Sequence, residues 1–448
     1  MKTAVRQWAL VIVTLLGAAA SFAETTAFVN VNVVPMTSDA VIAAQTVLVE
    51  DGIISAIGSV DEIRIPKGAR AVDGTDRYLM PGLAEMHAHV PAADSRNLDR
   101  DFSLFVANGI TTIRGMLGKP SHLALRQQLL DGEAFGPRLI TSGPSLNGRT
   151  VHGAPDARRQ VREQAAAGYD FIKVHPGLSA DEFTALAEMA NELGIPFAGH
   201  VPVAVGVRAA LGLNMATIDH LDGYFVALLQ PGSHGLGGYG GFFDIMLAAE
   251  LDPQQIDAIA AATAASATWN VPTQVLIEHR VSAMPASELQ NRAEMKYMSA
   301  ETVERWFATK QALLSERDFD PEVAELAIVL RRRLILALHE AGARLLLGSD
   351  APQVFNVPGY STHRELQVLV ASGLTPFEAL QTGTSAAAEF LGTNAGSVQV
   401  GKDADLVLLD ASPLEDIQNS RRIHGVMLRG LWMPAQTLQE RLKKYRRD

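Results

Sequence analysis

The sequence predicts an α/β protein whose centre is a (β/α)8 TIM barrel, with short strands at both ends of the chain. From about residue 79 onwards, short apolar segments alternate with helical segments rich in alanine and leucine, which is typical of parallel strands joined by helices. Polar residues follow several apolar segments at their carboxyl ends, where a barrel gathers its functional side chains. The segments before and after this region are short, turn-rich and β-like.

The composition narrows the classes of function. The chain has 448 residues, of which 48% are hydrophobic and 19% charged, as is ordinary for a globular enzyme. A formal net charge of -11 without a long basic run argues against nucleic acid or an anionic membrane surface as a partner. Because there is no cysteine, a metal site must use His, Asp, Glu or a modified Lys. Alanine-rich helices, such as the one expected at residues 256–267, could pack within the barrel or across a subunit interface, so a homo-oligomer is one possible state.

The first 23 residues have the pattern of a secretory signal peptide. Lys2 and Arg6 supply positive charge, residues 8–20 are apolar, and a small-x-small cleavage site ends at Ala23. The apolar segment is too short to span a bilayer comfortably, and a retained anchor is the alternative. The expectation is a secreted, periplasmic protein without a stable membrane anchor after cleavage near Ala23.

The expected strands and helices follow from apolar runs and turn signals. Residues 50–52, an acidic-glycine turn between apolar runs, predict a hairpin. Ser179 is a plausible N-cap with acidic residues in the first turn, and Gly194 ends the same helix. Strands are expected at residues 27–34, 46–49, 53–57, 110–114, 137–142, 171–175, 196–201, 216–221, 271–277 and 344–348. Helices are expected at residues 121–130, 154–167, 179–193 and 205–213.

Two segments interrupt the alternation of strands and helices. Residues 232–241 are rich in glycine, which is consistent with a mobile loop or with an active-site lid. Residues 285–333 predict a charged helical insertion between the last two strands. After residue 396 the chain returns to short strands with Gly and Asp turns.

Six polar residues stand where a metal site would need them. His87 and His89 follow the apolar residues 78–83 and would point the same way from an extended strand. Lys173 lies within an apolar strand pattern, where an amine is costly unless it is paired or modified. Each residue alone could be structural, but six of them at strand ends favour a metal centre. The other three are His200, His220 and Asp350.

This order of residues resembles the amidohydrolase superfamily, and within it the binuclear-metal branch related to imidazolonepropionase and the Xaa-Pro and Xaa-Arg dipeptidases. Residues 73–83 resemble the family's entry into the first barrel strand, and residues 400–407 its return into a small β-sandwich made from both chain ends. The resemblance covers nearly the whole mature chain. It implies a barrel over residues 79–392 and a sandwich from residues 24–78 and 393–448.

The resemblance also implies roles for the six residues. His87, His89 and Asp350 would bind the more buried metal, and His200 and His220 the other. Lys173, carboxylated by carbon dioxide or bicarbonate, would bridge both ions. Ligands without thiolate suit two Zn²⁺ ions, with Mn²⁺, Co²⁺ or Fe²⁺ as alternatives. A hydroxide bridging the metals would attack the substrate, and Asp350 would carry its proton to the leaving group.

Three further residues are candidates for contact with the substrate, each with a structural alternative. His152 could hydrogen-bond a substrate carbonyl or be a surface loop histidine. Tyr224 could stabilise an oxyanion or pack as an aromatic side chain. Arg364 could pair with a substrate carboxylate or form a surface salt bridge. His175, two residues beyond Lys173, is expected behind the ligands or in a loop.

The resulting functional expectation is a hydrolase of amide or peptide bonds, with a dipeptide or an N-acyl amino acid as substrate. Hydrolysis of cyclic amides, lactones or phosphotriesters is the alternative within the family. Deamination is less consistent with the sequence because deaminating members commonly lack the bridging lysine. Two other classes are weighed: a catalytically silent barrel, which typically loses ligands, and a periplasmic binding protein, which would have two lobes and a hinge.

Overall fold

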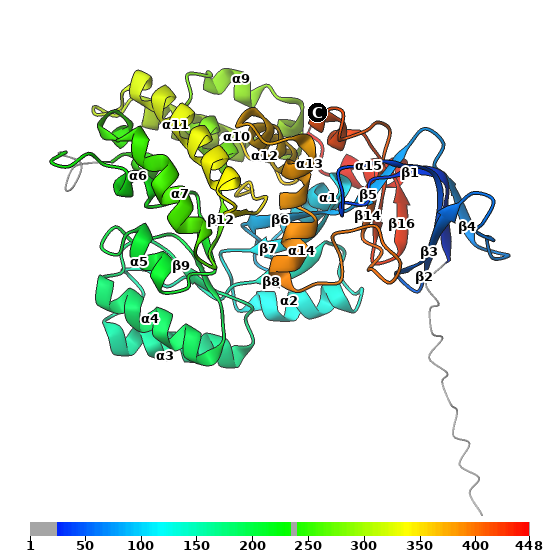
Figure 1. The fold of residues 1–448 in the computed structure, drawn as a ribbon, viewed down its shortest axis with the longest axis horizontal. Helices are drawn as coiled ribbons and strands as arrows, with labels where there is room; N and C mark the ends of the chain where they lie inside the picture. The colour runs from blue at the N-terminus through cyan, green and yellow to red at the C-terminus, as the bar shows by residue number, and fades with distance from the viewer. Residues whose placement is uncertain (1–24, 234–239, 448) are drawn as a thin grey trace, which may run out of the picture.

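The computed structural model describes residues 25–233 and 240–447 and shows an α/β fold. Two parallel sheets surrounded by helices form the larger part, and strands from both chain ends form a sheet at the right of Figure 1. The predicted signal peptide lies outside the described residues. In these described parts of the chain, every helix is too short or too polar to cross a membrane.

Strands from the two ends of the chain form one mixed sheet of eight strands. Its order is β16-β15-β14-β5-β1-β2-β3, and β4 pairs with β1 beside β5. The strand β1 bends at Asn30, whose φ is 56°, so that β4 pairs with its first half and β5 with its second. The bounds are β1 Thr26–Val33, β2 Ile42–Glu50, β3 Ile53–Ser59, β4 Arg70–Asp73, β5 Tyr78–Pro81, β14 Leu406–Leu409, β15 Ile423–Leu428 and β16 Leu431–Pro434.

This sheet has a hydrophobic core of its own. Phe28 from β1, Leu406 from β14 and Trp432 from β16 are among the buried side chains that pack together there. The hairpin between β2 and β3 confirms the turn expected from the sequence. Asp51 and Gly52 both have positive φ, 50° and 79°, as a two-residue hairpin turn requires.

All pairings in the two central sheets are parallel, so the carboxyl ends of these strands lie on the same side. The sheets have the orders β6-β7-β8 and β13-β12-β11-β10-β9. A parallel bridge between Ser142 and Phe171 connects β8 to β9, and another between Ala88 and Ala351 connects the segment after β13 to β6. The bounds are β6 Leu83–Ala88, β7 Ile110–Gly115, β8 Arg138–Thr141, β9 Ile172–Val174, β10 Phe197–Gly199, β11 Thr217–Asp219, β12 Trp269–Val271 and β13 Arg344–Leu345.

Helices pack around these sheets, and several begin and end where the sequence predicted. The helix α4 is the clearest case, because Ser179 and Glu182 form a capping box at its start and Gly194 ends it with φ of 69°. The bounds are α1 Leu98–Ala107, α2 Ser121–Leu130, α3 Ala154–Ala167, α4 Ala180–Leu193, α5 Val207–Gly212, α6 Tyr224–Ala227, α7 Ile256–Ala264, α8 Gln274–Val281, α9 Ala286–Gln290, α10 Ala300–Leu314, α11 Pro321–Glu340, α12 Tyr360–Ala371, α13 Pro376–Thr382, α14 Ser385–Leu391 and α15 Ala435–Lys443. Short 3-10 helices are η1 Phe242–Glu250, η2 Pro253–Gln255, η3 Ala293–Tyr297 and η4 Ile417–Arg421.

The expected strand at residues 271–277 is wrong. The strand β12 ends at Val271, Pro272 has no N–H to donate, and Thr273 has a φ of 46°. The helix α8 then starts at Gln274, where the buried carboxylate of Glu365 accepts hydrogen bonds from the first two backbone N–H groups, at 2.9 and 2.7 Å. A cap supplied from a distant part of the chain therefore decides between strand and helix here.

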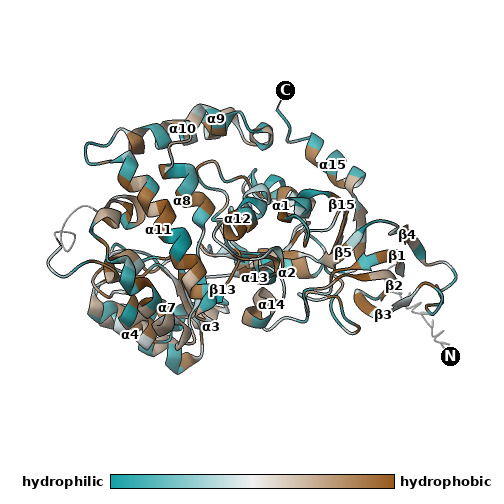
Figure 2. Ribbon diagram, turned by 45° about the horizontal axis from the view of Figure 1, so that its top comes forward, coloured by the Kyte–Doolittle hydropathy of each residue, from teal (hydrophilic) through white to brown (hydrophobic). Residues whose placement is uncertain are grey.

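The expected end of the insertion at residue 333 is also wrong. The helix α11 runs on to Glu340, and hydrophobic and hydrophilic residues alternate along it (Figure 2). Its buried residues recur every three or four positions, which gives it one face directed inward. One of them is Arg331, a buried cation whose contacts reach the strand ends described below.

Candidate metal centre

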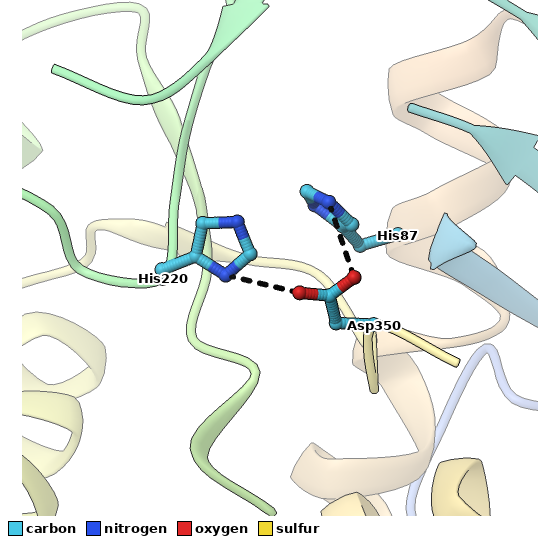
Figure 3. A group of neighbouring side chains, drawn as sticks. All are labelled: His87, His220 and Asp350. Carbon is cyan, nitrogen blue, oxygen red and sulfur yellow. Dashed lines mark ion pairs between the residues drawn. The ribbon is translucent and has the colours of Figure 1, made fainter. Parts of the chain in front are cut away.

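Three of the predicted ligands form a compact buried group. Ligand atoms of His87, His220 and Asp350 all lie within 4.8 Å of one another (Figure 3). One oxygen of Asp350 lies 3.1 Å from His89 Nε2 and 3.8 Å from His87 Nε2, and the other lies 3.8 Å from His220 Nδ1. Ligands bound at about 2.1 Å to one ion are roughly 3–4 Å apart, so the separations of Asp350 from His87 Nε2 and His89 Nε2 suit a shared cation.

The four predicted histidine ligands form one continuous cluster of rings. The ring centroids of His87 and His220 are 4.5 Å apart, and those of His200 and His220 are 4.6 Å apart. His89 adjoins His87 at 5.8 Å. The carboxyl ends of β6, β10 and β11 therefore bring together side chains that are more than 130 residues apart in sequence.

Each of these histidines has a polar group beside its Nδ1 atom. Such partners orient the imidazole and choose which nitrogen remains for a metal. The Asp219 carboxylate contacts His87 at 2.9 Å without the alignment of a hydrogen bond. The other partners are Gln353 for His89 at 3.1 Å, Asp222 for His200 at 3.0 Å and Thr273 for His220 at 2.8 Å.

The sequence analysis did not identify Asp219 and Asp222 as partners of the histidines, although both flank His220. In a regular strand, Asp219 and His220 would point to opposite faces. His220 and Leu221 instead have positive φ, 64° and 54°, which breaks the alternation and lets both side chains reach the cluster. The guanidinium of Arg331 donates a hydrogen bond to the His220 carbonyl at 2.8 Å and so supports this strained turn.

Lys173 is fully buried beside the cluster. Its Nζ atom has no hydrogen-bond partner in the described structure and lies 3.7 Å from Asp219 Oδ2. Burial lowers the pKa of Lys173. Gly199 on the neighbouring strand gives the lysine room, because a Cβ there would lie 2.4 Å from the Val174 carbonyl and 2.9 Å from Lys173 Cδ. A buried amine without a hydrogen-bond partner is consistent with a modified or metal-linked lysine.

The charge states of the cluster suit a bound cation. Burial, and next the charge of Lys173, lower the pKa of His89 to about 3. Burial also lowers the pKa values of His87, His200 and His220 well below the usual range, which leaves neutral imidazoles able to bind metal. The pKa of Asp350 is raised well above its ordinary value by burial. Neutral imidazoles and a carboxylate short of positive charge are a donor set for a divalent ion.

A buried glutamate that the sequence did not single out holds the segment before Asp350. The Glu85 carboxylate accepts hydrogen bonds from the Ser349 N–H, the Ser349 hydroxyl and the Thr362 hydroxyl, each at 2.7 Å. It also accepts from the His87 N–H at 3.1 Å. Glu85 precedes His87 by two residues on β6, so the alternation of side chains could have identified it.

A cavity of about 800 Å³ reaches His200. Its wall includes the carboxyl groups of Asp222, Asp244 and Glu182, and none of its described lining residues is Lys or Arg. Phe243 stacks on the His200 ring at 5.7 Å. Burial raises the pKa of Asp244 to about 6 and the pKa of Asp222 to about 7. Gly241 also lines this cavity, whereas residues 234–239 of the expected loop or lid lie outside the described residues.

The three predicted substrate residues are not brought together with the six. His152 is exposed on the loop before α3. Tyr224 is buried, with its hydroxyl donating to Asn270 Oδ1 at 2.8 Å and contacting Thr263, which corresponds to the packing alternative. Arg364 pairs with Glu294, which corresponds to the salt-bridge alternative. His175 is partly buried, and its ring lies 4.8 Å from that of His200.

The α/β fold and the buried His/Asp group together define a candidate metallohydrolase. Comparison with known proteins identifies it more closely: residues 78–433 match the amidohydrolase family, and the chain belongs to that family. It is 24% identical over 432 residues to an ochratoxinase of Aspergillus niger, covering 83% of this chain and 78% of that one. It is 23% identical over 387 residues to an enamidase of Eubacterium barkeri, covering 84% of each chain.

Among solved structures, the bottromycin amidohydrolase is similar with a TM-score of 0.71 and 26% identity, covering 94% of this chain and 90% of that one. The family is typically metal-dependent, and its relatives here are named as hydrolases of amide bonds. The protein is therefore a hydrolase that acts on carbon–nitrogen bonds, and the predicted relationship to amidohydrolases is confirmed.

Proposed function

We propose that this protein is a secreted, periplasmic binuclear metallohydrolase that cleaves the amide bond of a dipeptide. The observation that carries the proposal is the cluster of four neutral imidazoles, three of which lie within 3.8 Å of Asp350. Beside it lies the buried Lys173, whose Nζ atom has no hydrogen-bond partner in the described structure. The two linked parallel sheets are then one closed (β/α)8 barrel, and the sheet from both chain ends is the small sandwich domain.

We assign the donor set to the two metal positions expected from the sequence. His87, His89 and Asp350 would hold one ion, His200 and His220 the other, and a carboxylated Lys173 would connect them. Zn²⁺ suits these nitrogen and oxygen ligands. When bound, two such ions supply an acidic water molecule as nucleophile and polarise the scissile carbonyl.

The chain's own residues provide proton transfer and substrate orientation. Asp350, fixed through Ser349 and Glu85, accepts a proton from the attacking water and delivers it to the leaving nitrogen. The acidic wall made by Asp222 and Asp244 suits the ammonium group of a dipeptide. A neutral N-acyl group would not have this charge attraction, so a dipeptide is preferred over an N-acyl amino acid.

The first test is the metal content of the purified mature protein. We expect close to two divalent ions per chain in wild type and a clear loss in Lys173→Ala, measured by inductively coupled plasma mass spectrometry. Lys67→Ala, an exposed lysine in the N-terminal part, is the matched control and should keep both ions. A single ion unaffected by Lys173→Ala would contradict the binuclear site, as would no metal after reconstitution with zinc and bicarbonate.

Substrate class and location are tested separately. A dipeptide library and its N-acetylated counterparts should show faster hydrolysis of the free dipeptides. Edman sequencing of the periplasmic protein should begin at Glu24, directly after the expected cleavage site. Equal rates for both substrate sets would contradict the dipeptide proposal, and an intact N-terminus would contradict secretion by cleavage.

A further inference from the structure

A second cavity, of about 560 Å³, lies between α8, α11 and α12. It shares no lining residue with the cavity that reaches His200. Three arginines line it, and two of them are neutralised. Arg332 makes two hydrogen bonds to the Glu278 carboxylate, at 2.8 and 2.7 Å, and Arg364 pairs with Glu294.

The third arginine, Arg292, has no carboxylate partner at ion-pair distance among the described residues. Its two terminal nitrogens instead contact His279 Nε2 at 2.7 Å and Met284 Sδ at 3.3 Å. Since His279 Nε2 accepts from the guanidinium, its Nδ1–H donates to Asn356 Oδ1 at 2.7 Å and the ring is neutral. The histidine therefore orients Arg292 but does not balance its charge.

The electrostatic surroundings of Arg292 are consistent with a missing anion. Burial, and next the charge of Arg364, lower the pKa of Arg292 to about 10. Burial also lowers the pKa of His279 well below its usual range, so this ring adds no charge. Glu294 and Glu288 oppose this shift from beyond ion-pair distance. A guanidinium that is partly removed from water and has no carboxylate in direct contact would gain from a bound carboxylate.

The rest of the cavity wall offers a second donor and an apolar surface. The amide nitrogen of Gln367 is buried and has no hydrogen-bond partner in the described structure. Val275, Ile328 and Val368 supply apolar area on α8, α11 and α12. Charged side chains also line this cavity, among them Glu278 and Glu325, so its wall combines polar groups with one apolar surface.

We propose that this cavity binds a small organic carboxylate with a short hydrocarbon chain. Its carboxylate takes hydrogen bonds from Arg292 and Gln367, and its chain packs against Val275, Ile328 and Val368. The site is independent of the proposed peptide hydrolysis, because it lies apart from the histidine cluster and uses none of its residues.

The test is isothermal titration calorimetry of the full mature protein with hexanoate as the probe. Hexan-1-ol and hexylamine keep the chain length but remove or reverse the charge, and neither should bind. Arg292→Gln should weaken hexanoate binding by about tenfold or more, as expected for a charge-assisted hydrogen bond. Arg317→Gln, an exposed arginine of the same insertion, is the matched control and should bind as wild type does.

Gln367→Glu gives a second test that does not depend on Arg292→Gln folding. A carboxylate placed in the cavity wall should compete for Arg292 and abolish hexanoate binding. Failure of hexanoate to bind wild type overturns the proposal. Binding unchanged in both cavity variants also overturns it, because the probe would then lie elsewhere, for example at the histidine cluster.

Discussion

The cavity beside His200 and the cavity between α8, α11 and α12 are both lined by half-buried charged side chains, but their backbones differ. The first is built from strand ends and η1, and Phe243 and Asp244 there have left-handed φ values of 54° and 58°. His220 and Asp350 in the adjoining cluster are left-handed as well. The second cavity lies mainly between regular helices.

The two cavities also differ in the charges that line them. Carboxylates line the cavity beside His200, whereas between the helices Arg292 has no carboxylate partner at ion-pair distance among the described residues. Strained backbone collects where several side chains must meet at one point, and this is typical of reactive sites. Regular helices with one unbalanced cation are sufficient for binding. The comparison distinguishes the proposed reactive site beside His200 from the proposed binding site between the helices.

The largest expected effect is at Asp350. Asp350→Asn removes the group that would carry the proton and one of the ligands, so we expect kcat to fall by about 10²–10⁴-fold. Steady-state hydrolysis of a dipeptide measures this. Asp61→Asn, an exposed aspartate, should keep full activity. A variant at Asp350 with near wild-type kcat would remove the chemical difference between the two cavities.

A smaller effect is expected at Asp219, which contacts His87 without being a predicted ligand. Asp219→Asn keeps the shape but removes the charge, so metal affinity should fall by about 10–100-fold. Competition with a chelator, followed by metal analysis, measures the affinity. Unchanged affinity would mean that Asp219 serves only Arg114, to which it is also paired at 3.2 Å.

The acidic wall predicts a change in substrate preference. Asp244→Asn should raise KM for a dipeptide by roughly tenfold, since one charge-assisted hydrogen bond is lost. The KM of the N-acetylated dipeptide should stay the same, because it has no ammonium group. Equal changes in KM for both substrates would show that Asp244 contributes to the shape of the cavity and does not bind the ammonium group.

The smallest effect is on stability, at the carboxyl group that caps α8 between the two cavities. Burial raises the pKa of Glu365 to about 8. The unfolded chain ionises this group near pH 4, so the folded protein loses stability as the pH rises from there to 8. The free energy of unfolding of Glu365→Gln, relative to that of wild type, should therefore rise between pH 5 and pH 8 by more than about 1 kcal/mol. Urea denaturation of both proteins at pH 5 and at pH 8 measures these free energies. The same difference between variant and wild type at both pH values would refute the prediction.

Local signals explain what the sequence could predict. The start and end of α4 follow from Ser179, Glu182 and Gly194, whose effects act within a few residues. Five of the six predicted ligands lie at or just after the ends of parallel strands, and Asp350 follows β13 by five residues. The alternation of strands with helices places these strand ends on one side. The roles assigned to these ligands stay predictions.

What the sequence could not show depends on distant contacts. Residues 271–277 are apolar enough for a strand, but Glu365 on α12 accepts the first two N–H groups of a helix in the second half. Asp219 and the next residue, His220, both reach the cluster because the backbone turns left-handed at His220, where Arg331 from α11 holds it. Tyr224 follows His220 closely in sequence, yet its hydroxyl is taken up by Asn270.

The room left by Gly199 has a consequence for classifying relatives of this protein. Any side chain at that position would collide with the Val174 carbonyl and with Lys173. A homologue could therefore keep every histidine, the lysine and the aspartate and still be unable to assemble them. Counting conserved ligands would label it an enzyme, whereas the residue on the neighbouring strand would mark it as inactive.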